Sequence, residues 1–280
     1  MVRRALDAGP TGADVTLIGA DEQVAAAGTG RTIGVGPWGD GTGGDAAAGR
    51  IAAESVARAV ALVRAGDAHA VVTGPVHKQA LHRAGFRYPG LTEFLAHLAG
   101  DVEVAMMLAT GPLRVVLVTT HLPLREAIAG LSTDRIVRAG KIAKLALTKW
   151  WGIAAPRLAL CAVNPHAGEG GLFGSEDDTI LAPAAAALGA AGPLPADTVF
   201  VRALKGEFDA VLAPYHDVGM TAVKVAGFGK GVNVTLGLPF IRTAPDHGTA
   251  FDIAGKGVAD ASSMRAAVEL AVKLAGAPAP

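Results

Sequence analysis

Short apolar runs alternate with helical patterns along almost the whole of this 280-residue chain. VTLIGA at 15–20 and AVVTGP at 70–75 have the length and composition of buried strands. The segments 45–65 and 134–151 instead have the length, capping residues and apolar spacing of helices. Such alternation is typical of βαβ units, so we predict an α/β fold with a largely parallel sheet and helices on both faces.

Composition and charge narrow the classes of partner. The net charge is zero and the pI is near 7.1, so the chain has no polybasic surface for nucleic acid or an anionic membrane. No apolar run approaches the length of a membrane helix, and no secretory signal follows the basic start. The single cysteine, Cys161, lies in an apolar run and fits a reducing compartment. We expect a soluble, cytoplasmic protein.

Three of the strand-like runs end in a histidine: VVLVTTH at His121, LALCAVNPH at His166 and AVLAPYH at His216. Parallel strands finish at one edge of a sheet, where ligands bind, so the three imidazoles would meet in one crevice. Imidazole suits Zn²⁺, Co²⁺ or Fe²⁺, and three protein ligands leave positions open for substrate. The alternative at each position is a hydrogen-bonded structural histidine, and spacing alone leaves it open.

Further polar residues follow the same runs. Asp217 stands beside His216, and Asp197 lies in PADT; either carboxylate could orient an imidazole or act as a base, or merely cap a turn. Lys224, Asn233 and Arg242 are spaced nine apart and together would hold a phosphate or carboxylate. The alternative is three unrelated surface side chains.

Two glycine-rich stretches could bind a nucleotide. GVGPWG and GDGTGG, at 34–39 and 39–44, both spell the dinucleotide fingerprint, but Pro37 and Trp38 interrupt the first and no apolar strand precedes it. We predict a plain glycine loop there. PDHGTAFDIAGKGVAD instead resembles the loop with which isocitrate and isopropylmalate dehydrogenases hold the adenosine end of a nicotinamide cofactor.

From about Asp45 to Lys273 the chain resembles the 4-hydroxythreonine-4-phosphate dehydrogenase family of vitamin B6 biosynthesis. The motifs that carry the resemblance occur in the family's order: VVTGPVHKQAL, MMLATGPLRVVLVTTHLPLREA, NPHAGEGGLFGSED, GPLPADT, YHDVG, GVNVTLGLPFIRT and DHGTAFDIAGKG. The resemblance implies a two-lobed, isocitrate/isopropylmalate dehydrogenase-like fold with a cleft between the lobes. We expect a cofactor-binding lobe at 1–92 and 232–280 and a metal-binding and dimerisation lobe at 93–231.

The family's functional residues carry over by motif. One divalent metal per subunit (Zn, Co or Mg), at a site shared by two subunits of a homodimer, falls on His121, His166 and His216. The remaining roles fall on three groups: substrate binding on Thr92, Lys224, Asn233 and Arg242; cofactor binding on His247, Gly248, Thr249, Asp252 and Gly255; and proton transfer on Asp217, Asp197 or Lys78.

The implied activity is oxidation and decarboxylation of 4-phosphohydroxy-L-threonine to 3-amino-2-oxopropyl phosphate with NAD, or NADP. Leu91 stands where the family has a substrate-contacting histidine, so a related substrate is the first alternative: a four-carbon sugar-acid phosphate, such as threonate or erythronate phosphate, or a terephthalate-type dihydrodiol. Alternatives of another class are a metal-dependent phosphate-ester hydrolase and an inactive metabolite-binding paralogue. The family's opening strand and GDPAGIGPE-like turn have no match at the start of this sequence, so we expect either an upstream start or a truncation.

Overall fold

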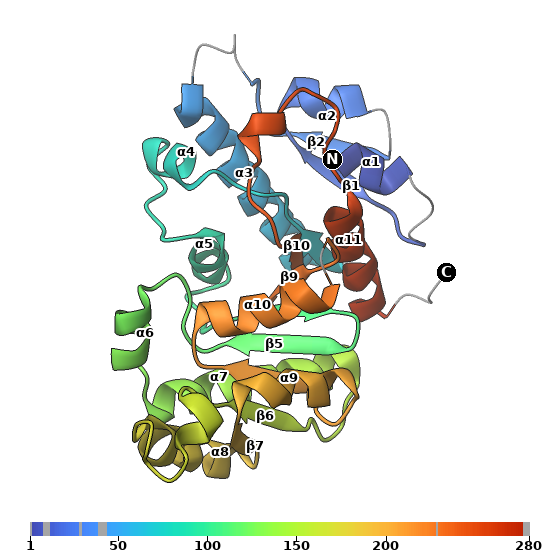
Figure 1. Ribbon diagram of the computed structural model, residues 1–280. Coiled ribbons are helices and arrows are strands. Elements are labelled where there is room, and N and C mark those ends of the chain that lie inside the picture. Colours follow the sequence, from blue (N-terminus) through green and yellow to red (C-terminus); the bar gives the residue numbers. More distant parts are fainter. Residues whose placement is uncertain (1, 8–11, 28–29, 39–43, 228, 277–280) are drawn as a thin grey trace. The chain divides into compact units, whose positions relative to one another are not determined.

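The computed structural model of the chain describes residues 2–7, 12–27, 30–38, 44–227 and 229–276 (Figure 1). The chain forms two compact units: a discontinuous unit of residues 1–103 and 238–280, and a central unit of residues 104–237. The sequence predicts boundaries at 92/93 and 231/232, whereas the units part at 103/104 and 237/238, which places Asn233 in the central unit. The α/β architecture predicted from the alternation of runs is confirmed.

The discontinuous unit has two parallel strand pairs, β1 with β2 and β3 with β10. Its elements are α1 (Val2–Asp7), β1 (Thr16–Gly19), α2 (Asp21–Ala27), β2 (Arg31–Gly34), α3 (Gly44–Ala65), β3 (Ala70–Val72), α4 (Lys78–Arg83), α5 (Leu91–Leu98), β10 (Ile241–Pro245), a 3₁₀ turn at Phe251–Ile253 and α11 (Ser262–Leu274). The α3 and α4 helices approach so closely that a Cβ at Gly49 would lie 1.9 Å from the Ala80 carbonyl oxygen, so only glycine fits there.

One expectation about this unit is wrong. A strand, β2, does precede the Gly34 fingerprint, and α3 begins on Gly44, the last glycine of the second copy. The short run RTIG gave little apolar signal because three of its four residues are exposed, while its hydrogen bonds come from the parallel pairing with β1. Most of the second fingerprint, residues 39–43, lies outside the described residues.

The central unit is built on six strands in the order β9-β4-β5-β8-β6-β7. The β4 strand is antiparallel to both β5 and β9, and the pairs β5–β8, β8–β6 and β6–β7 are parallel. Its elements are β4 (Ala105–Thr110), β5 (Leu113–Leu117), α6 (Leu124–Ala129), α7 (Thr133–Trp151), β6 (Leu158–Cys161), a tight turn at Pro165–Gly168 that is not helical inside, a π-helical turn at Asp177–Leu181, α8 (Ala182–Leu188), β7 (Ala191–Leu194), α9 (Ala196–Leu204), β8 (Ala210–Ala213), α10 (His216–Gly227) and β9 (Val232–Leu236).

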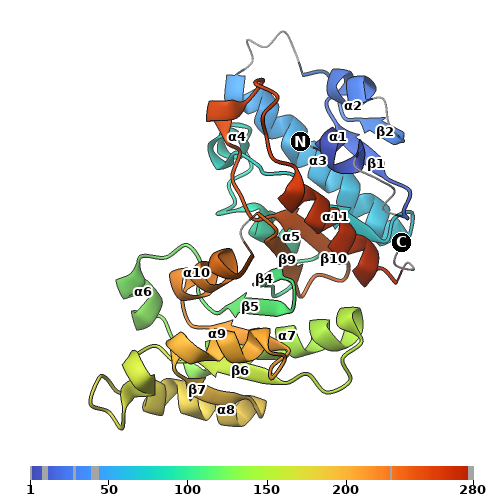
Figure 2. The same cartoon turned by 45° about the vertical axis from the view of Figure 1, so that its right-hand side comes forward.

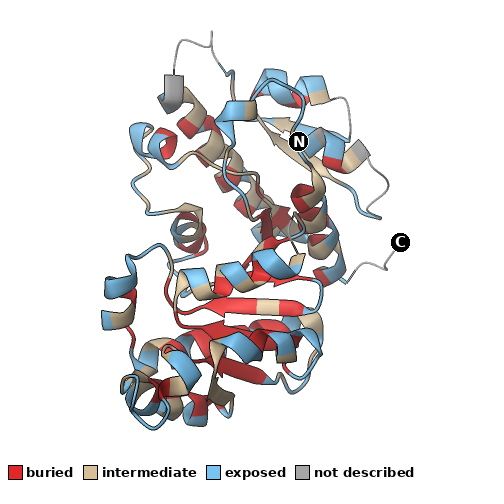
Figure 3. Cartoon of the chain, viewed as in Figure 1, coloured by how far each residue is buried: buried red, intermediate tan, exposed pale blue. Residues whose placement is uncertain are grey.

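Alternate residues of the central strands face opposite layers of helices. On one face Val115, Val211 and Ala159 pack against Val199 and Phe200 of α9 and Val223 of α10, and all of these side chains are buried. The helices α9 and α10 lie along the central strands, which are coloured as buried over most of their length (Figures 2 and 3). Each fully buried Val or Phe in such a cluster contributes roughly 1.5 to 3 kcal/mol relative to exposure. Every residue of β6 and β8 is buried, so these strands form a rigid base for the loops that follow them.

Helix boundaries follow local chemistry. The α7 helix begins after Ser132, whose hydroxyl accepts the Arg135 N–H, and it ends at Gly152 in the left-handed conformation. Among the described residues, no helix is long and apolar enough to cross a membrane.

Candidate metal centre and active site

The three strand-end histidines follow three neighbouring parallel strands. The β8 strand lies between β5 and β6, so His216 follows the middle strand, and His121 and His166 follow the strands on either side. The topology therefore delivers all three residues to the carboxyl edge of the central sheet, as the repeated pattern predicts.

Two of these imidazoles are adjacent. The ring centroids of His121 and His216 lie 5.4 Å apart with the planes inclined at 44°. Two imidazoles bound to one tetrahedral ion through nitrogens at about 2.1 Å have centroids about 5 Å apart, so the pair fits metal coordination. His121 has φ of +50°, a left-handed conformation that costs a non-glycine residue roughly 1 to 3 kcal/mol and is concentrated at functional sites.

Carboxylates hold the δ nitrogens of two of the histidines. The His216 Nδ1 lies 2.7 Å from Asp217 Oδ1, and the His166 Nδ1 lies 3.1 Å from Glu169 Oε2. This contact fixes the ring and leaves Nε2 directed away from the carboxylate, which is the arrangement found around metal-binding histidines. Glu169 belongs to the NPHAGEGG motif and was not among the predicted site residues.

His166 stands apart from the other two. It lies on an exposed turn and its side chain is 68% exposed. Within the part of the chain that the structure describes, no group of three or more His, Cys, Asp or Glu residues could hold a metal ion. The sheet edge thus pairs His121 with His216, while the third imidazole extends outward on its own loop.

A groove runs between α9 and α10, next to His216. It has a volume of about 590 Å³, and Asp197, Asp217, Tyr215 and Thr221 supply its polar groups among apolar residues of both helices. Burial raises the pKa of the Tyr215 hydroxyl, so this group remains neutral at physiological pH. Asp217 is engaged with His216, whereas Asp197 is exposed on the first turn of α9.

The four predicted substrate-binding residues divide between the two units. Lys224 is exposed on α10, and Asn233 lies on β9 with its Oδ1 buried and without a hydrogen-bond partner in the structure. Arg242 and Thr92 belong to the discontinuous unit. An unsatisfied buried amide oxygen is costly, which suits a group that awaits a ligand.

Arg242 is buried on β10, and its guanidinium donates to the Thr73 hydroxyl at 2.6 Å. Desolvation lowers the pKa of Arg242 to about 10, which still leaves it charged at neutral pH. A charged guanidinium can form paired hydrogen bonds with a phosphate or carboxylate, which is the role predicted for Arg242 from the sequence. Thr73, in the VVTGP motif, orients the guanidinium and was not among the predicted site residues.

Lys78 and the start of α5 are neighbours. Lys78 is the first residue of α4, and its Cε lies 3.9 Å from where a Cβ at Gly90 would stand. Leu91 and Thr92 are the first two residues of α5, both partly exposed. The N-cap of this helix is Gly90, which has no side chain to cap it, and Glu93 lies in its first turn.

The predicted cofactor loop follows β10. His247, Gly248 and Asp252 are exposed, Thr249 is partly exposed, and a Cβ would meet nothing within 4 Å at either Gly248 or Gly255. The loop is tied at its base, where the Asp246 N–H donates to Ser263 Oγ at 3.3 Å. The loop thus offers open glycine backbone that a nucleotide can approach.

His77 is a second residue that the sequence reasoning missed. Its ring meets the exposed Phe251 of the cofactor loop edge to face at 5.0 Å, and its Nδ1 is buried without a hydrogen-bond partner. The VHK motif carried no signal for this contact, because the two residues are distant in sequence.

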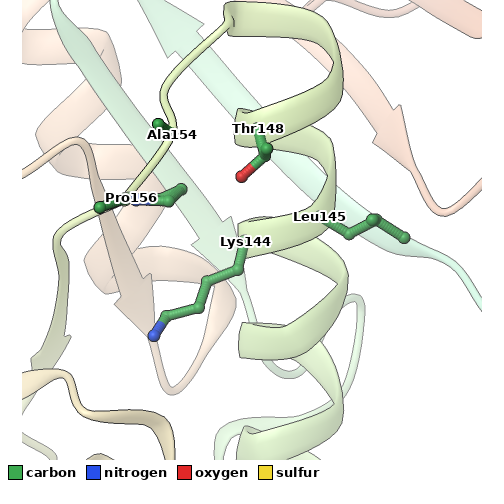
Figure 4. A pocket seen from close by; sticks show the side chains of 6 residues that line it. Lys144, Leu145, Thr148, Ala154 and Pro156 are labelled. Atoms are coloured by element: carbon green, nitrogen blue, oxygen red, sulfur yellow. The ribbon is translucent and has the colours of Figure 1, made fainter.

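A second pocket is lined by residues for which the sequence predicts no role in this chemistry. It lies beside the carboxyl-terminal half of α7, with a volume of about 520 Å³, and is lined by Lys144, Leu145, Thr148, Ala154, Ala155 and Pro156 (Figure 4). The Lys144 ammonium donates to the Leu188 carbonyl, so this pocket's one cation is already engaged in a structural contact.

Comparisons with known proteins agree with this layout. Residues 19–271 match the family described as pyridoxal phosphate biosynthetic protein PdxA. A 4-hydroxythreonine-4-phosphate dehydrogenase from Beijerinckia indica is 49% identical over 234 residues, covering 82% of this chain and 69% of that relative. A D-threonate 4-phosphate dehydrogenase from Cupriavidus necator is 50% identical over 236 residues, covering 82% and 71%.

Among solved structures, a 4-hydroxythreonine-4-phosphate dehydrogenase from Klebsiella pneumoniae superposes with a TM-score of 0.87 at 40% identity, covering 98% of this chain and 93% of that one. The family match spans most of the chain, and both the curated relatives and the solved structure exceed the similarity at which fold and family are shared. The chain belongs to the pyridoxal phosphate biosynthetic protein PdxA family.

Proposed function

We propose that this chain is a 4-hydroxythreonine-4-phosphate dehydrogenase. It oxidises and decarboxylates 4-phosphohydroxy-L-threonine to 3-amino-2-oxopropyl phosphate in pyridoxal phosphate biosynthesis, in the cytoplasm, with NAD and a divalent metal. The single observation that supports this most strongly is the His121–His216 pair with Asp217 behind it, in a chain of this family. The spacing of that pair suits a metal, and the relative from Beijerinckia indica is named as a dehydrogenase.

The metal site is proposed to use His121, His216 and a His166 from a second copy of the chain in a homodimer. Two features support this arrangement: His121 and His216 are adjacent within one chain, and His166 extends outward with its Nδ1 held by Glu169. Zn²⁺ or Co²⁺ suits an all-imidazole set better than Mg²⁺, which prefers oxygen ligands.

When bound, the divalent metal supplies Lewis-acid polarisation of the substrate hydroxyl, and the nicotinamide cofactor accepts the hydride. The residues of the chain bind and orient the substrate. Arg242, held by Thr73, neutralises the anionic end of the substrate. Lys224, Asn233 and Thr92 add hydrogen-bond donors that fix the position of the substrate. Since Asp217 orients His216, Asp197 and Lys78 remain the candidates for taking the hydroxyl proton.

The discontinuous unit is proposed to carry the cofactor on His247, Gly248, Thr249, Asp252 and Gly255. The exposed glycine backbone of this loop and the adjacent buried His77 nitrogen support that assignment over the Gly34 loop. A strand and a helix do flank the Gly34 fingerprint, so the two loops must be separated by experiment.

A second candidate substrate is D-threonate 4-phosphate. Relatives with this name reach 50% identity, as high as those named for 4-hydroxythreonine-4-phosphate, so overall similarity does not choose between them. Leu91, partly exposed at the start of α5, supports an altered contact in the substrate site. The two substrates share the carboxylate, the oxidised hydroxyl and the phosphate, and differ at the second carbon.

The test is an NADH-formation assay on the purified chain with both phosphorylated substrates, NAD or NADP, and Zn²⁺, Co²⁺ or Mg²⁺. We expect metal-dependent NADH formation with one or both substrates. Release of inorganic phosphate without NADH would instead establish the hydrolase alternative. Tight substrate binding without either product would establish a metabolite-binding paralogue.

A further inference from the structure

The loop that carries His166 has an unusual backbone. Six consecutive residues have positive φ: His166 (53°), Ala167 (58°), Gly168 (80°), Glu169 (44°), Gly170 (66°) and Gly171 (89°). L-residues adopt this left-handed conformation as single residues and seldom in succession, because Cβ then crowds the following carbonyl. Three of the six are not glycine, so something outside the turn must hold it in place.

Asp177 is the group that holds the entry to this turn. It is 0% exposed, and its two carboxylate oxygens accept the backbone N–H groups of Val163 at 2.9 Å and Asn164 at 3.0 Å. These two residues lead directly into the left-handed turn. A buried carboxylate that accepts two backbone donors fixes the peptide planes it contacts.

A second tie closes the same loop. The Asn164 amide donates to Glu176 Oε2 at 2.9 Å, and a Cβ at Gly174 would lie 2.7 Å from that carboxylate oxygen. A Cβ at Gly168, in the middle of the left-handed run, would stand 3.5 Å from Asp177 Cβ. Asp177 therefore binds the entry of the turn and lies beside its centre.

We infer that Asp177 is a positioning residue for His166, assisted by the Asn164–Glu176 contact. The inference rests on the proposed function, in which His166 binds the metal. Asp177 touches neither metal nor substrate; it fixes the peptide that aims the His166 ring. Without it, the turn relaxes toward right-handed conformations, and the imidazole no longer meets its metal.

The test is a Co²⁺ titration of the full-length chain, followed by the visible absorption of bound Co²⁺, with thermal unfolding measured in parallel. Asp177→Asn replaces one carboxylate oxygen, which accepts a backbone N–H, with an NH₂ group that cannot accept it. We expect Co²⁺ affinity at least tenfold weaker and an altered absorption band, in the range seen when residues behind metal ligands are changed.

Asp209→Asn is the matched control. Asp209 is a partly buried carboxylate of the same unit that also accepts a backbone N–H, from Arg157 at 2.8 Å, but it precedes β8 and so lies at the opposite edge of the sheet. It is expected to lower the unfolding temperature and leave Co²⁺ affinity unchanged. Adding Ala167→Gly to Asp177→Asn removes one strained residue and is expected to restore part of the affinity.

The outcomes separate the inference from the function on which it rests. If His166→Ala binds Co²⁺ as the unmodified chain does, the metal role of His166 fails. If His166→Ala loses Co²⁺ affinity while Asp177→Asn binds Co²⁺ as tightly as Asp209→Asn does, the positioning role of Asp177 is overturned. Should Asp177→Asn not fold, Asn164→Ala decides: a smaller loss of Co²⁺ affinity supports the inference, and unchanged affinity refutes it.

Discussion

The ring centroids of His216 and His121 lie 5.4 Å apart, and the two residues follow the neighbouring parallel strands β8 and β5. One residue of this pair is held by Asp217, and the other sits in a strained left-handed conformation. Hydrogen-bonded structural histidines at strand ends require neither feature. The pair is therefore the best place to begin testing the proposed activity.

Loss of any one of the three imidazoles is expected to lower bound metal and turnover together. Single alanine substitutions at His121, His166 and His216 should each reduce metal content by about tenfold or more, because a three-ligand site has no spare ligand. The control is His97→Ala, since His97 also pairs with a carboxylate, Asp101, at 2.9 Å but lies in the discontinuous unit. Elemental analysis after dialysis measures the effect, and full metal content in a variant would remove that residue from the site.

Arg242→Met is expected to separate stability from function. Replacing a buried guanidinium, whose pKa desolvation lowers to about 10, with an apolar side chain of similar length should leave the unfolding temperature unchanged or raise it. The kcat/KM for a phosphorylated substrate should fall roughly a hundredfold or more, because the substrate anion loses its buried partner. A strong loss of stability with normal kcat/KM would show that Arg242 is structural.

The cofactor loop can be tested against the Gly34 fingerprint. Asp252→Asn or Gly248→Val should weaken NAD binding by about tenfold, whereas a shortened 39–44 loop should bind NAD normally. Isothermal titration with NAD provides the measurement. Since a strand precedes Gly34 and a helix begins at Gly44, the reverse result would assign the nucleotide to that loop.

Leu91→His is expected to raise activity on 4-phosphohydroxy-L-threonine. A histidine at the first residue of α5 adds a donor to an anionic substrate, worth roughly 1.5 to 3 kcal/mol, or one to two powers of ten in kcat/KM. The comparison is the same variant with D-threonate 4-phosphate. If the unmodified chain prefers an unphosphorylated dihydrodiol and Arg242→Met has little effect, the vitamin B6 assignment is wrong.

The buried thiol of Cys161 is expected to make the stability of the folded chain fall at alkaline pH. Desolvation raises the pKa of the buried thiol to about 12, whereas the unfolded chain ionises it from about pH 8.5. Because the folded state binds this proton more tightly, the stability it contributes is complete below pH 8.5 and is lost as the pH rises toward 12. Urea unfolding between pH 8 and 10 should show a smaller loss of stability in Cys161→Ala than in the unmodified chain.

Much of the fold is readable from local patterns. The strand β8 and the helix α7 were evident because a continuous apolar run and a capped amphipathic segment carry their own signal. The strand β2 was not evident from the sequence, because three of its four residues are exposed. It is held by backbone pairing with β1, which local strand propensity does not reveal.

The site was predictable in the same uneven way. Parallel topology let the sequence place His121 and His216 at one edge, and the ring contact bears this out. Thr73 behind Arg242, His77 against Phe251 and Asp177 behind the His166 loop were not anticipated, because each acts through a contact between segments that are distant in sequence. The roles given to the four substrate-binding residues and the cofactor loop remain predictions.

The antiparallel pairing of β4 with β9 has a consequence for biogenesis. Ala105 stands opposite Leu236, so the first and last strands of the central unit are partners, and this stretch closes on itself. During synthesis its six strands can pair with one another while the segment that supplies β10 and α11 is still within the ribosome. The discontinuous unit must wait for that segment, and a piece cut at 104 and 237 should be a natural candidate for expression on its own.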